Sequence, residues 1–151
     1  MSELLRLDRV GIAVTNLQES GGRLERIGFE RRREGEVGPE PDQGYPGLNA
    51  RWAAYGLGQS EPIVLLEPLG PDGPIHEFLE EHGPGVQHIA FAVQDINAAG
   101  KALTALGIDL ARQEPYHDTA GNLCHFIAPK DVPGVLVALL QSPDTQSNPF
   151  E

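Results

Sequence analysis

Two stretches, "LDRVGIAV" at Leu7–Val14 and "VQHIAFAV" at Val86–Val93, decide the fold because they repeat one pattern at a spacing of 79 residues. Each alternates bulky apolar residues with small ones, which is typical of a β-strand with one packed face and one open face. The open face carries a polar side chain at the third position, Arg9 in the first stretch and His88 in the second. These two residues therefore occupy equivalent places in a repeat.

The repeat continues beyond these two strands. Leu7–Phe29 aligns with Val86–Ile108 without a gap, with five identities in 23 positions. A helical pattern follows each strand, with Asn16 and Asp95 as predicted N-caps and Gly107 as a predicted C-cap. Three further strands are predicted in each copy: Glu30–Val37, Ala50–Leu57 and Pro62–Leu66 in the first, and Asp109–Glu114, Leu123–Ala128 and Val135–Leu140 in the second.

This order of elements predicts an α+β fold made of two tandem βαβββ modules. The first module covers residues 1–70 and the second 85–142, and a linker helix opened by Pro74 lies within 71–84. A polar, flexible tail is expected at 143–151. Since each module has an open sheet with one covered face, we expect the two to join around a shared half-barrel cavity as one compact domain. Arg9 and His88 are then expected to face each other across that cavity.

Composition and charge restrict the class of partner. The formal net charge of −11 argues against nucleic acid or an anionic membrane as a partner, supports solubility and mildly favours cationic ligands. Cys124 is the single cysteine, which excludes an internal disulfide and fits a reducing compartment. No apolar run is long enough to span a bilayer, and the amino terminus lacks the features of a signal peptide, so we expect a cytoplasmic protein.

The order of three motifs over Leu5–Gln141 resembles a known superfamily. "DRVGIAV", "IVLLEPLGPDGPIHEFLEEHGPGVQHIAF" and "GVLVALL" resemble the vicinal oxygen chelate proteins, which include glyoxalase I, bleomycin-resistance proteins and extradiol dioxygenases. Within them, the chain looks closest to the methylmalonyl-CoA epimerase branch. The resemblance implies the glyoxalase-like arrangement of paired βαβββ modules, and it implies a homodimer.

The resemblance also implies four metal-ligating positions, which in this chain are Arg9, Val64, His88 and Ala138. Arginine stays protonated, and valine and alanine have no donor atoms, so only His88 could bind a metal. The last position also serves as a catalytic base in the epimerase, and the strand expected to carry the other base, Ala50–Leu57, contains no acid. We therefore expect a degenerate metal site, no cofactor and no ordinary epimerisation. A rebuilt divalent-metal centre at His88 is the alternative.

Five residues form the predicted ligand site: Arg9, Arg51, Trp52, His88 and His125. Arg9 would hold a carboxylate, phosphate or enolate oxygen, or it is a strand-end arginine that reaches water or pairs with an acid such as Asp8. His88 would contact the ligand, or it is a core histidine bonded to a backbone carbonyl. Arg51 and Trp52 alternate, so only one of them faces the cavity. His125 faces either the cavity or solvent, and a strand histidine without chemistry is the simpler interpretation.

Three functions are compatible with these residues. The first is metal-independent binding of a small organic acid, acyl thioester or drug, as in bleomycin resistance. The second is an isomerase, epimerase or lyase acting on an acyl thioester or related acid, in which Arg9 replaces the metal and His88 is the acid or base. The third is a non-catalytic subunit that has kept its interface. The sequence leaves open whether the protein is an enzyme.

Overall fold

The structure, a computed structural model, describes residues 5–41, 47–117, 121–128 and 134–142. Within these residues the chain forms eight β-strands and three α-helices, so the predicted α+β class is confirmed. The chain divides into an N-terminal unit, Arg9–Gln87, and a C-terminal unit, which comprises His88–Glu151 together with Met1–Asp8. The predicted linker helix falls in the N-terminal unit, and the predicted tail lies outside the described residues. None of the described helices is long and apolar enough to cross a membrane.

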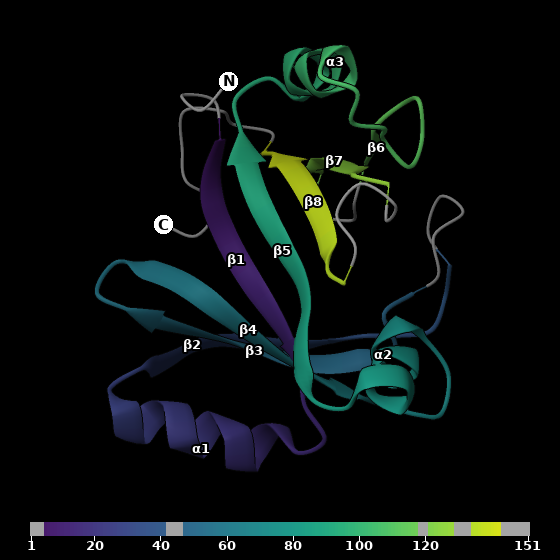
Figure 1. Cartoon of the computed structure of the whole chain (residues 1–151). Helices are drawn as coiled ribbons and strands as arrows, with labels where there is room; N and C mark the ends of the chain where they lie inside the picture. The colour runs from purple at the N-terminus through teal and green to yellow at the C-terminus, as the bar shows by residue number, and fades with distance from the viewer. Residues whose placement is uncertain (1–4, 42–46, 118–120, 129–133, 143–151) are drawn as a thin grey trace. The chain divides into compact units, whose positions relative to one another are not determined.

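The N-terminal unit has the predicted βαβββ order, followed by one more helix (Figure 1). Its elements are β1 (Leu5–Ala13), α1 (Leu17–Ile27), β2 (Glu30–Val37), β3 (Ala50–Leu57), β4 (Ser60–Pro68) and α2 (Pro74–His82). The strand order is β2-β3-β4-β1, in which β1 runs parallel to β4 and the other pairs are antiparallel. The predicted helix starts are confirmed, since the Asn16 side chain accepts the Glu19 N–H at 3.0 Å and Pro74 is the first residue of α2.

Helix α1 covers one face of this sheet, the α1 face. Leu17 of the helix is buried with Ala53, Tyr55 and Leu65 of the strands, and Leu24 packs against the same cluster. Gly21 lies directly over Tyr55, because a Cβ atom added to the glycine would overlap the Tyr55 hydroxyl oxygen. The close approach of helix and strand at this point therefore requires glycine.

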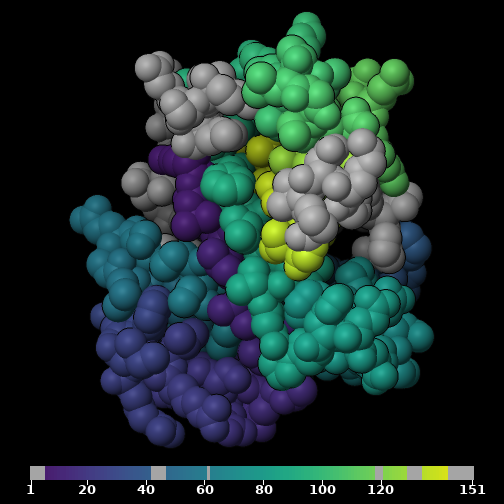
Figure 2. All heavy atoms as spheres, in the orientation of Figure 1, coloured from purple at the N-terminus to yellow at the C-terminus, as the bar shows by residue number. Residues whose placement is uncertain are grey.

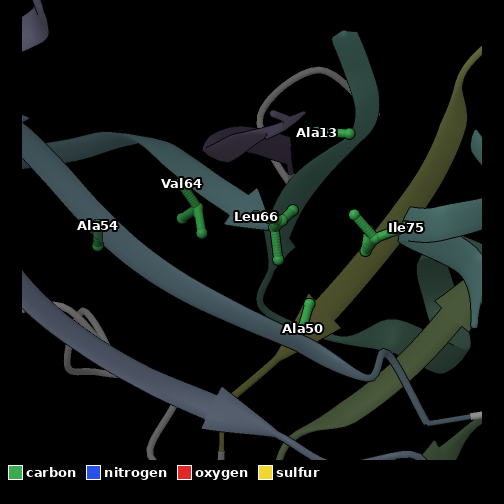
Figure 3. Packing of buried hydrophobic residues seen from close by; sticks show 6 residues of the cluster. All are labelled: Ala13, Ala50, Ala54, Val64, Leu66 and Ile75. Carbon is green, nitrogen blue, oxygen red and sulfur yellow. The ribbon is translucent and has the colours of Figure 1, made fainter. Parts of the chain in front are cut away.

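Helix α2 packs against the opposite face of the same sheet. The buried cluster there consists of Ala13, Ala50, Ala54, Val64, Leu66 and Ile75 (Figure 3). Ile75 comes from α2 and is fully buried, and Phe78 and Leu79 of the same helix pack against the cluster. Small side chains on the strands let the helix approach, which explains Ala50 and Ala54 in β3.

The C-terminal unit repeats the arrangement with a shorter sheet. Its elements are β5 (Gly85–Val93), α3 (Ile96–Ala105), β6 (Tyr116–His117), β7 (Leu123–Phe126) and β8 (Leu136–Gln141), with strand order β5-β8-β7-β6. Helix α3 packs on Val93 and Leu139, and its outer side forms the green surface in Figure 2. The Asp95 side chain caps the helix by accepting the Ala98 N–H at 3.1 Å. The helix ends at Ala105 with Leu106 as its C-cap, so the prediction of Gly107 as the C-cap is wrong by one residue, and Gly107 follows with a φ of +85°.

The strand predicted at Asp109–Glu114 is wrong. That segment makes a single bridge between Leu110 and Ile127, and a strand of only two residues begins later, at Tyr116. Pro115 has no N–H to donate, so a ladder cannot run continuously from this segment into β6.

A contact that the two units share supports the repeat. In the N-terminal unit the Glu67 carboxylate, at the end of β4, accepts the Leu17 N–H at 3.0 Å. In the C-terminal unit the Gln141 side chain, at the end of β8, accepts the Ile96 N–H at 2.7 Å. In both units the last strand thus caps the helix that follows the first strand.

Candidate functional site

The face of the N-terminal sheet opposite α1, the α2 face, carries Arg9, the first of the predicted site residues. Ala13 belongs to the cluster under α2, and side chains alternate along a strand, so Gly11 and Arg9 point to the same side. Val64 lies beside Gly11 on the neighbouring strand, and Ala54 lies beside Val64. Half-buried Arg9 therefore stands next to a row of small and apolar side chains.

Trp52 also lies on the α2 face. It is half-buried and packs against the cluster that contains Ala50 and Ala54. The guanidinium carbon of Arg33 lies 6.0 Å from the centre of the Trp52 ring, which is a cation–π contact. Gly35 is opposite Trp52 across the strands, and a Cβ atom there would lie 3.0 Å from the indole. The indole therefore lies flat along the strand that carries Gly35.

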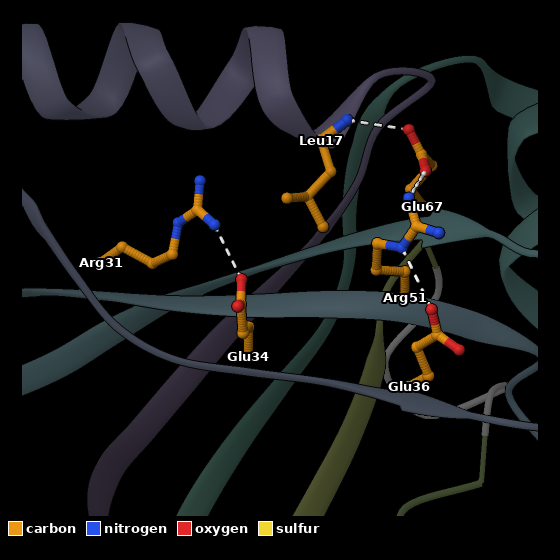
Figure 4. Close-up of polar contacts among 6 residues, drawn as sticks. All are labelled: Leu17, Arg31, Glu34, Glu36, Arg51 and Glu67. Atoms are coloured by element: carbon orange, nitrogen blue, oxygen red, sulfur yellow. Dashed lines mark hydrogen bonds and ion pairs between the residues drawn. The ribbon is translucent and has the colours of Figure 1, made fainter.

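Arg51 lies on the α1 face, so the structure does not bring it together with Trp52. Its Nε donates to Glu36 at 3.3 Å, and its Nη1 lies 3.5 Å from a Glu67 oxygen (Figure 4). Arg31 donates to Glu34 at 2.7 Å nearby, a contact that raises the pKa of the arginine. Four of these residues, Arg31, Glu34, Arg51 and Glu67, line a depression of about 350 Å³ at the start of α1. Carboxylates balance both arginines there, which makes the depression a poor site for an anion.

His88 lies in the C-terminal unit on the face of the sheet opposite α3. Phe91 and Val93 pack against α3, and by alternation His88, Ala90 and Ala92 point the other way. The His88 side chain is buried, with 8% of the residue exposed, and Leu136 is its neighbour across the strands. Whether His88 and Arg9 face each other stays a prediction.

The prediction that His125 faces a cavity or solvent is wrong. His125 is paired with Leu139, which packs under α3, and a Cβ atom on Gly100 of that helix would lie 3.7 Å from the imidazole. The histidine is therefore buried between helix and sheet, with 4% of it exposed. Burial lowers the pKa of His125, and the negative charge of Glu114 opposes that shift only in part.

Three of the four implied ligand positions, Arg9, Val64 and Ala138, have side chains that do not bind a metal ion, and whether the protein works without a metal stays a prediction. Gly11 pairs with Val64 in one unit, and Ala90 pairs with Ala138 in the other, so Val64 and Ala138 occupy equivalent places. Neither side chain has a donor atom, and an arginine stays protonated. In the part of the chain that the structure describes, no group of three or more His, Cys, Asp or Glu side chains gathers as a metal centre would require.

Sequence reasoning missed two residues. Arg33 is the last of three consecutive arginines. Because the strand contains a bulge between Arg31 and Arg33, the sequence does not show which side of the sheet each arginine faces. Glu67 was read only as part of a motif, although its position just after an apolar strand was a signal for helix capping. The side that Arg33 faces follows only from the register of β2, β3 and β4, which the structure provides.

Comparison with known proteins matches the chain to one superfamily and to several similar proteins, some of which are epimerases. Residues 8–127 match the family model described as the Glyoxalase/Bleomycin resistance protein/Dioxygenase superfamily. The Bacillus subtilis protein YqjC is 31% identical over 97% of this chain and 99% of its own length. The ethylmalonyl-CoA/methylmalonyl-CoA epimerase of Cereibacter sphaeroides is 33% identical over 90% of this chain and 97% of its own length. The crystal structure of methylmalonyl-CoA epimerase from Mycobacterium tuberculosis matches with a TM-score of 0.72 and 30% identity, over 93% of this chain and 89% of that one.

Proposed function

This chain belongs to the glyoxalase/bleomycin resistance protein/dioxygenase superfamily, and we propose that it binds a small organic acid or its acyl thioester without using a metal ion. The chemistry of two equivalent places supports this proposal. Val64 lies beside Gly11, and Ala138 lies beside Ala90. None of these side chains has a donor atom, so the middle of each sheet is buried and apolar at the places where the resemblance implies metal ligands.

Arg9 is the residue that we assign to the acid group of the ligand. It is half-buried and stands two residues before Gly11 on the same face of β1. A guanidinium keeps its charge at every physiological pH and binds a carboxylate through two parallel hydrogen bonds. Partial burial strengthens such a contact relative to one in water. An arginine can thus supply the positive charge that a metal would otherwise provide.

His88 is the second residue of the proposal. Its imidazole is buried, with 8% of the residue exposed, so it carries a fixed donor or acceptor into an apolar environment. We assign it a hydrogen bond to a ligand oxygen. If both side chains contact one ligand, the effects of Arg9→Ala and His88→Ala on binding will not be additive.

Epimerisation is a second candidate, and the epimerases among the relatives favour it. In that reaction a base removes the proton from the carbon next to the thioester carbonyl, and the electron pair moves onto the carbonyl oxygen. Returning a proton to the opposite face of that carbon restores the thioester with inverted configuration. His88 would be the base that takes up the first proton, water would supply the proton to the opposite face, and Arg9 would stabilise the oxyanion.

Metal content tests the proposal first. Elemental analysis of untagged protein, followed by thermal melts with added cobalt, nickel and zinc, should give substoichiometric metal and no shift of Tm. One tightly bound ion per chain would contradict the metal-independent site. It would instead indicate a rebuilt centre at His88.

Ligand binding tests the role of Arg9. We expect methylmalonyl-CoA and free methylmalonate to bind, and Arg9→Ala to weaken both by about tenfold, as for loss of one charged hydrogen-bonded contact. Arg6→Ala is the matched control, because Arg6 is exposed on the same strand and alternation places it on the other side. If Arg9→Ala and Arg6→Ala bind equally well, Arg9 does not hold the acid group.

Isotope exchange separates the binding protein from the enzyme. In D₂O an epimerase exchanges the proton next to the thioester carbonyl, which NMR follows directly, whereas a binding protein leaves it in place. Exchange that is lost in His88→Ala would establish the second candidate. Binding without exchange would establish the first.

A further inference from the structure

The depression at the start of α1 has charged groups of both signs in its walls. Its volume of about 350 Å³ is at the lower end of the range for small-molecule sites, which is about 300–1,000 Å³. The charged side chains that line it are two arginines and two glutamates: Arg31, Glu34, Arg51 and Glu67. A ligand of this depression is therefore small, and its charges have to suit walls that carry both signs.

The four charged side chains form two ion pairs (Figure 4). In the first pair the Arg31 guanidinium donates to the Glu34 carboxylate at 2.7 Å. In the second pair the Arg51 guanidinium lies 3.5 Å from the Glu67 carboxylate. A small molecule that lies between the two pairs meets a carboxylate of one pair and a guanidinium of the other.

The register of the strands brings Glu34 of the first pair close to Arg51 of the second. Glu34 is paired with Ala53, and Ala53 lies two residues from Arg51 on the same face of β3. One strand spacing across and two residues along the strand separate the backbones of Glu34 and Arg51 by about 8 Å. Two long side chains that leave one face of a sheet at this separation can both contact one small ligand.

Both of these side chains are open to solvent. The exposed fraction of the side chain is 64% for Glu34 and 53% for Arg51. A guanidinium has several N–H donors and a carboxylate has several acceptor sites, so an ion pair of this kind saturates neither group. A ligand can therefore bind to them while both ion pairs stay in place.

The C-terminal unit forms the corresponding helix start without charged residues. Gln141 caps α3 as Glu67 caps α1. The neighbour of Gln141 on the next strand is Leu123, which is apolar. The corresponding neighbour of Glu67 is Arg51. A neutral and an apolar residue thus suffice for this part of the fold, and exposed ion pairs add little stability. The fold alone does not account for the charges in the N-terminal unit.

We infer that the depression binds a small zwitterion, such as a free α-amino acid, with its ammonium group on Glu34 and its carboxylate on Arg51. A ligand with only negative charge is repelled by the carboxylates of the walls, and one with only positive charge is repelled by the arginines. A zwitterion offers the opposite charge to both kinds of wall group. Arg31 and Glu67 hold the two contacting side chains in position.

This site goes beyond the proposed function and does not depend on it. The depression lies on the α1 face of the N-terminal sheet, because Arg51 alternates with Ala53 and Tyr55 in the manner of one strand face, and those two pack under α1. Arg9 lies on the α2 face of the same sheet. One protein can therefore bind an acid on one face and an amino acid on the other.

Nuclear magnetic resonance of isotope-labelled protein tests the site with free amino acids. Each standard amino acid is added at about 10 mM, which detects a Kd on the order of 1 mM. We expect at least one of them to shift the backbone amide signals of Leu17 and Gln18, which line the depression. The acid without the ammonium group and the amine without the carboxylate should each bind at least about tenfold more weakly. For alanine these two probes are propionate and ethylamine.

Four variants assign the contacts. Glu34→Gln and Arg51→Gln remove the two charges, and each should weaken binding of the same amino acid by about tenfold. Arg23→Gln is the matched control, because it breaks an exposed ion pair with Glu19 on α1, and neither residue lines the depression. It should leave binding unchanged, and so should Arg9→Ala on the other face. The amide spectrum of each variant also shows whether it is folded.

Every outcome supports or overturns the site. If no amino acid shifts the signals of Leu17 and Gln18, the depression is not a ligand site. If the acid or the amine binds as tightly as the amino acid, the depression recognises one charge, and the zwitterion is wrong. Binding that persists in both Glu34→Gln and Arg51→Gln places the ligand elsewhere and overturns the assignment. The proposed function stands in each of these cases, because its own test uses Arg9.

Discussion

The two units differ most in what lies between helix and sheet. In the N-terminal unit Gly21 of α1 lies over Tyr55, which is fully buried. In the C-terminal unit the equivalent glycine of α3, Gly100, lies over His125 and Leu110. The repeat has thus kept a glycine at the helix–sheet contact and changed the side chain beneath it. In the first unit the side chain beneath the glycine is a phenol that leaves no space for a Cβ atom, whereas in the second unit it is an imidazole, which can be protonated.

A second difference concerns charge at the start of each helix. Glu67 caps α1 and also lies near Arg51, while Gln141 caps α3 with a neutral side chain. The geometry of the cap is the same, but only the N-terminal cap has an electrostatic component. Substitutions at these positions can therefore separate hydrogen bonding from charge.

Gly21→Ala should have the largest effect on stability. The new Cβ would overlap the hydroxyl oxygen of a fully buried tyrosine, so helix and strand must separate. Overpacking of about 3 kcal/mol is offset by about 1 kcal/mol of improved helix propensity, which leaves a net loss of about 2 kcal/mol. Urea unfolding of the purified variant measures it.

Two other glycines provide matched controls for Gly21→Ala. A Cβ atom added to Gly22 would have nothing within 4 Å, so Gly22→Ala should raise the free energy of unfolding by about 1 kcal/mol. Gly100→Ala places its Cβ 3.2 Å from a Leu110 methyl group, which can shift slightly, so that variant should be nearly neutral. Equal losses at Gly21 and Gly100 would contradict the contrast between the units.

Tyr55→Phe should partly rescue Gly21→Ala. It removes the oxygen nearest to the new Cβ, although the ring carbon Cζ would still lie 2.8 Å away. The hydroxyl is buried and has no hydrogen-bond partner among the described residues, so its removal alone should not destabilise the protein. A double-mutant cycle with a coupling of about 1 kcal/mol would support the contact, and simple additivity would exclude it.

The sequence predicted features that depend on local chemistry. Asn16 and Asp95 were identified as caps because a short polar side chain before an apolar helical pattern acts on its own backbone. Gly107 was also placed near the end of its helix, one residue beyond the cap. Strand faces were predictable within β1 and β5, where alternation is regular.

The facing of the other site residues could not be predicted. Arg51 and Trp52 alternate, but only the register with β2 and β4 assigns one to α1 and the other to α2. His125 lies in a strand whose other residues are apolar, so alternation does not show which side it faces, and its contact with Gly100 joins residues that are distant in sequence. The pairing register between strands therefore determines which face of the sheet these side chains occupy, and the local sequence pattern does not.

Protonation of His125 should destabilise the C-terminal unit at low pH. Burial lowers the pKa of His125 in the folded protein below its usual 6.5, so the unfolded chain binds the proton more readily. The associated stability is present above pH 6.5 and is lost as the pH falls below that value. Urea unfolding at pH 7.5 and pH 5 should show this loss in the wild type.

His125→Gln removes the titration and should flatten that pH dependence. His117→Gln is the control in the same unit, because His117 is exposed. We expect the control to keep the wild-type slope between pH 7.5 and pH 5. If His125→Gln keeps that slope as well, the imidazole is not the group responsible.

Removing the side chain of Glu67 or Gln141, which accepts a helix N–H, should lower the free energy of unfolding by a smaller amount, about 1 kcal/mol. Glu67→Ala and Gln141→Ala each leave a helix N–H, that of Leu17 or Ile96, without its side-chain acceptor. Similar losses in urea unfolding would show that the two caps are equivalent in their hydrogen bonds. A loss at only one of them would mean that water replaces the other acceptor at no cost.

The smallest effect, a few tenths of a kcal/mol, is expected for Glu67→Gln, which gives the N-terminal unit the neutral cap of the C-terminal unit. The acceptor oxygen for the Leu17 N–H is kept, while the attraction of the charge to the start of α1 and to Arg51 is lost. In 1 M NaCl charges are screened over about 3 Å, so the difference from the wild type should shrink there. Gln141→Glu should show the opposite sign with the same salt dependence. A loss for Glu67→Gln that is unchanged by salt would mean that the amide fits the site less well, and charge would then not distinguish the two caps.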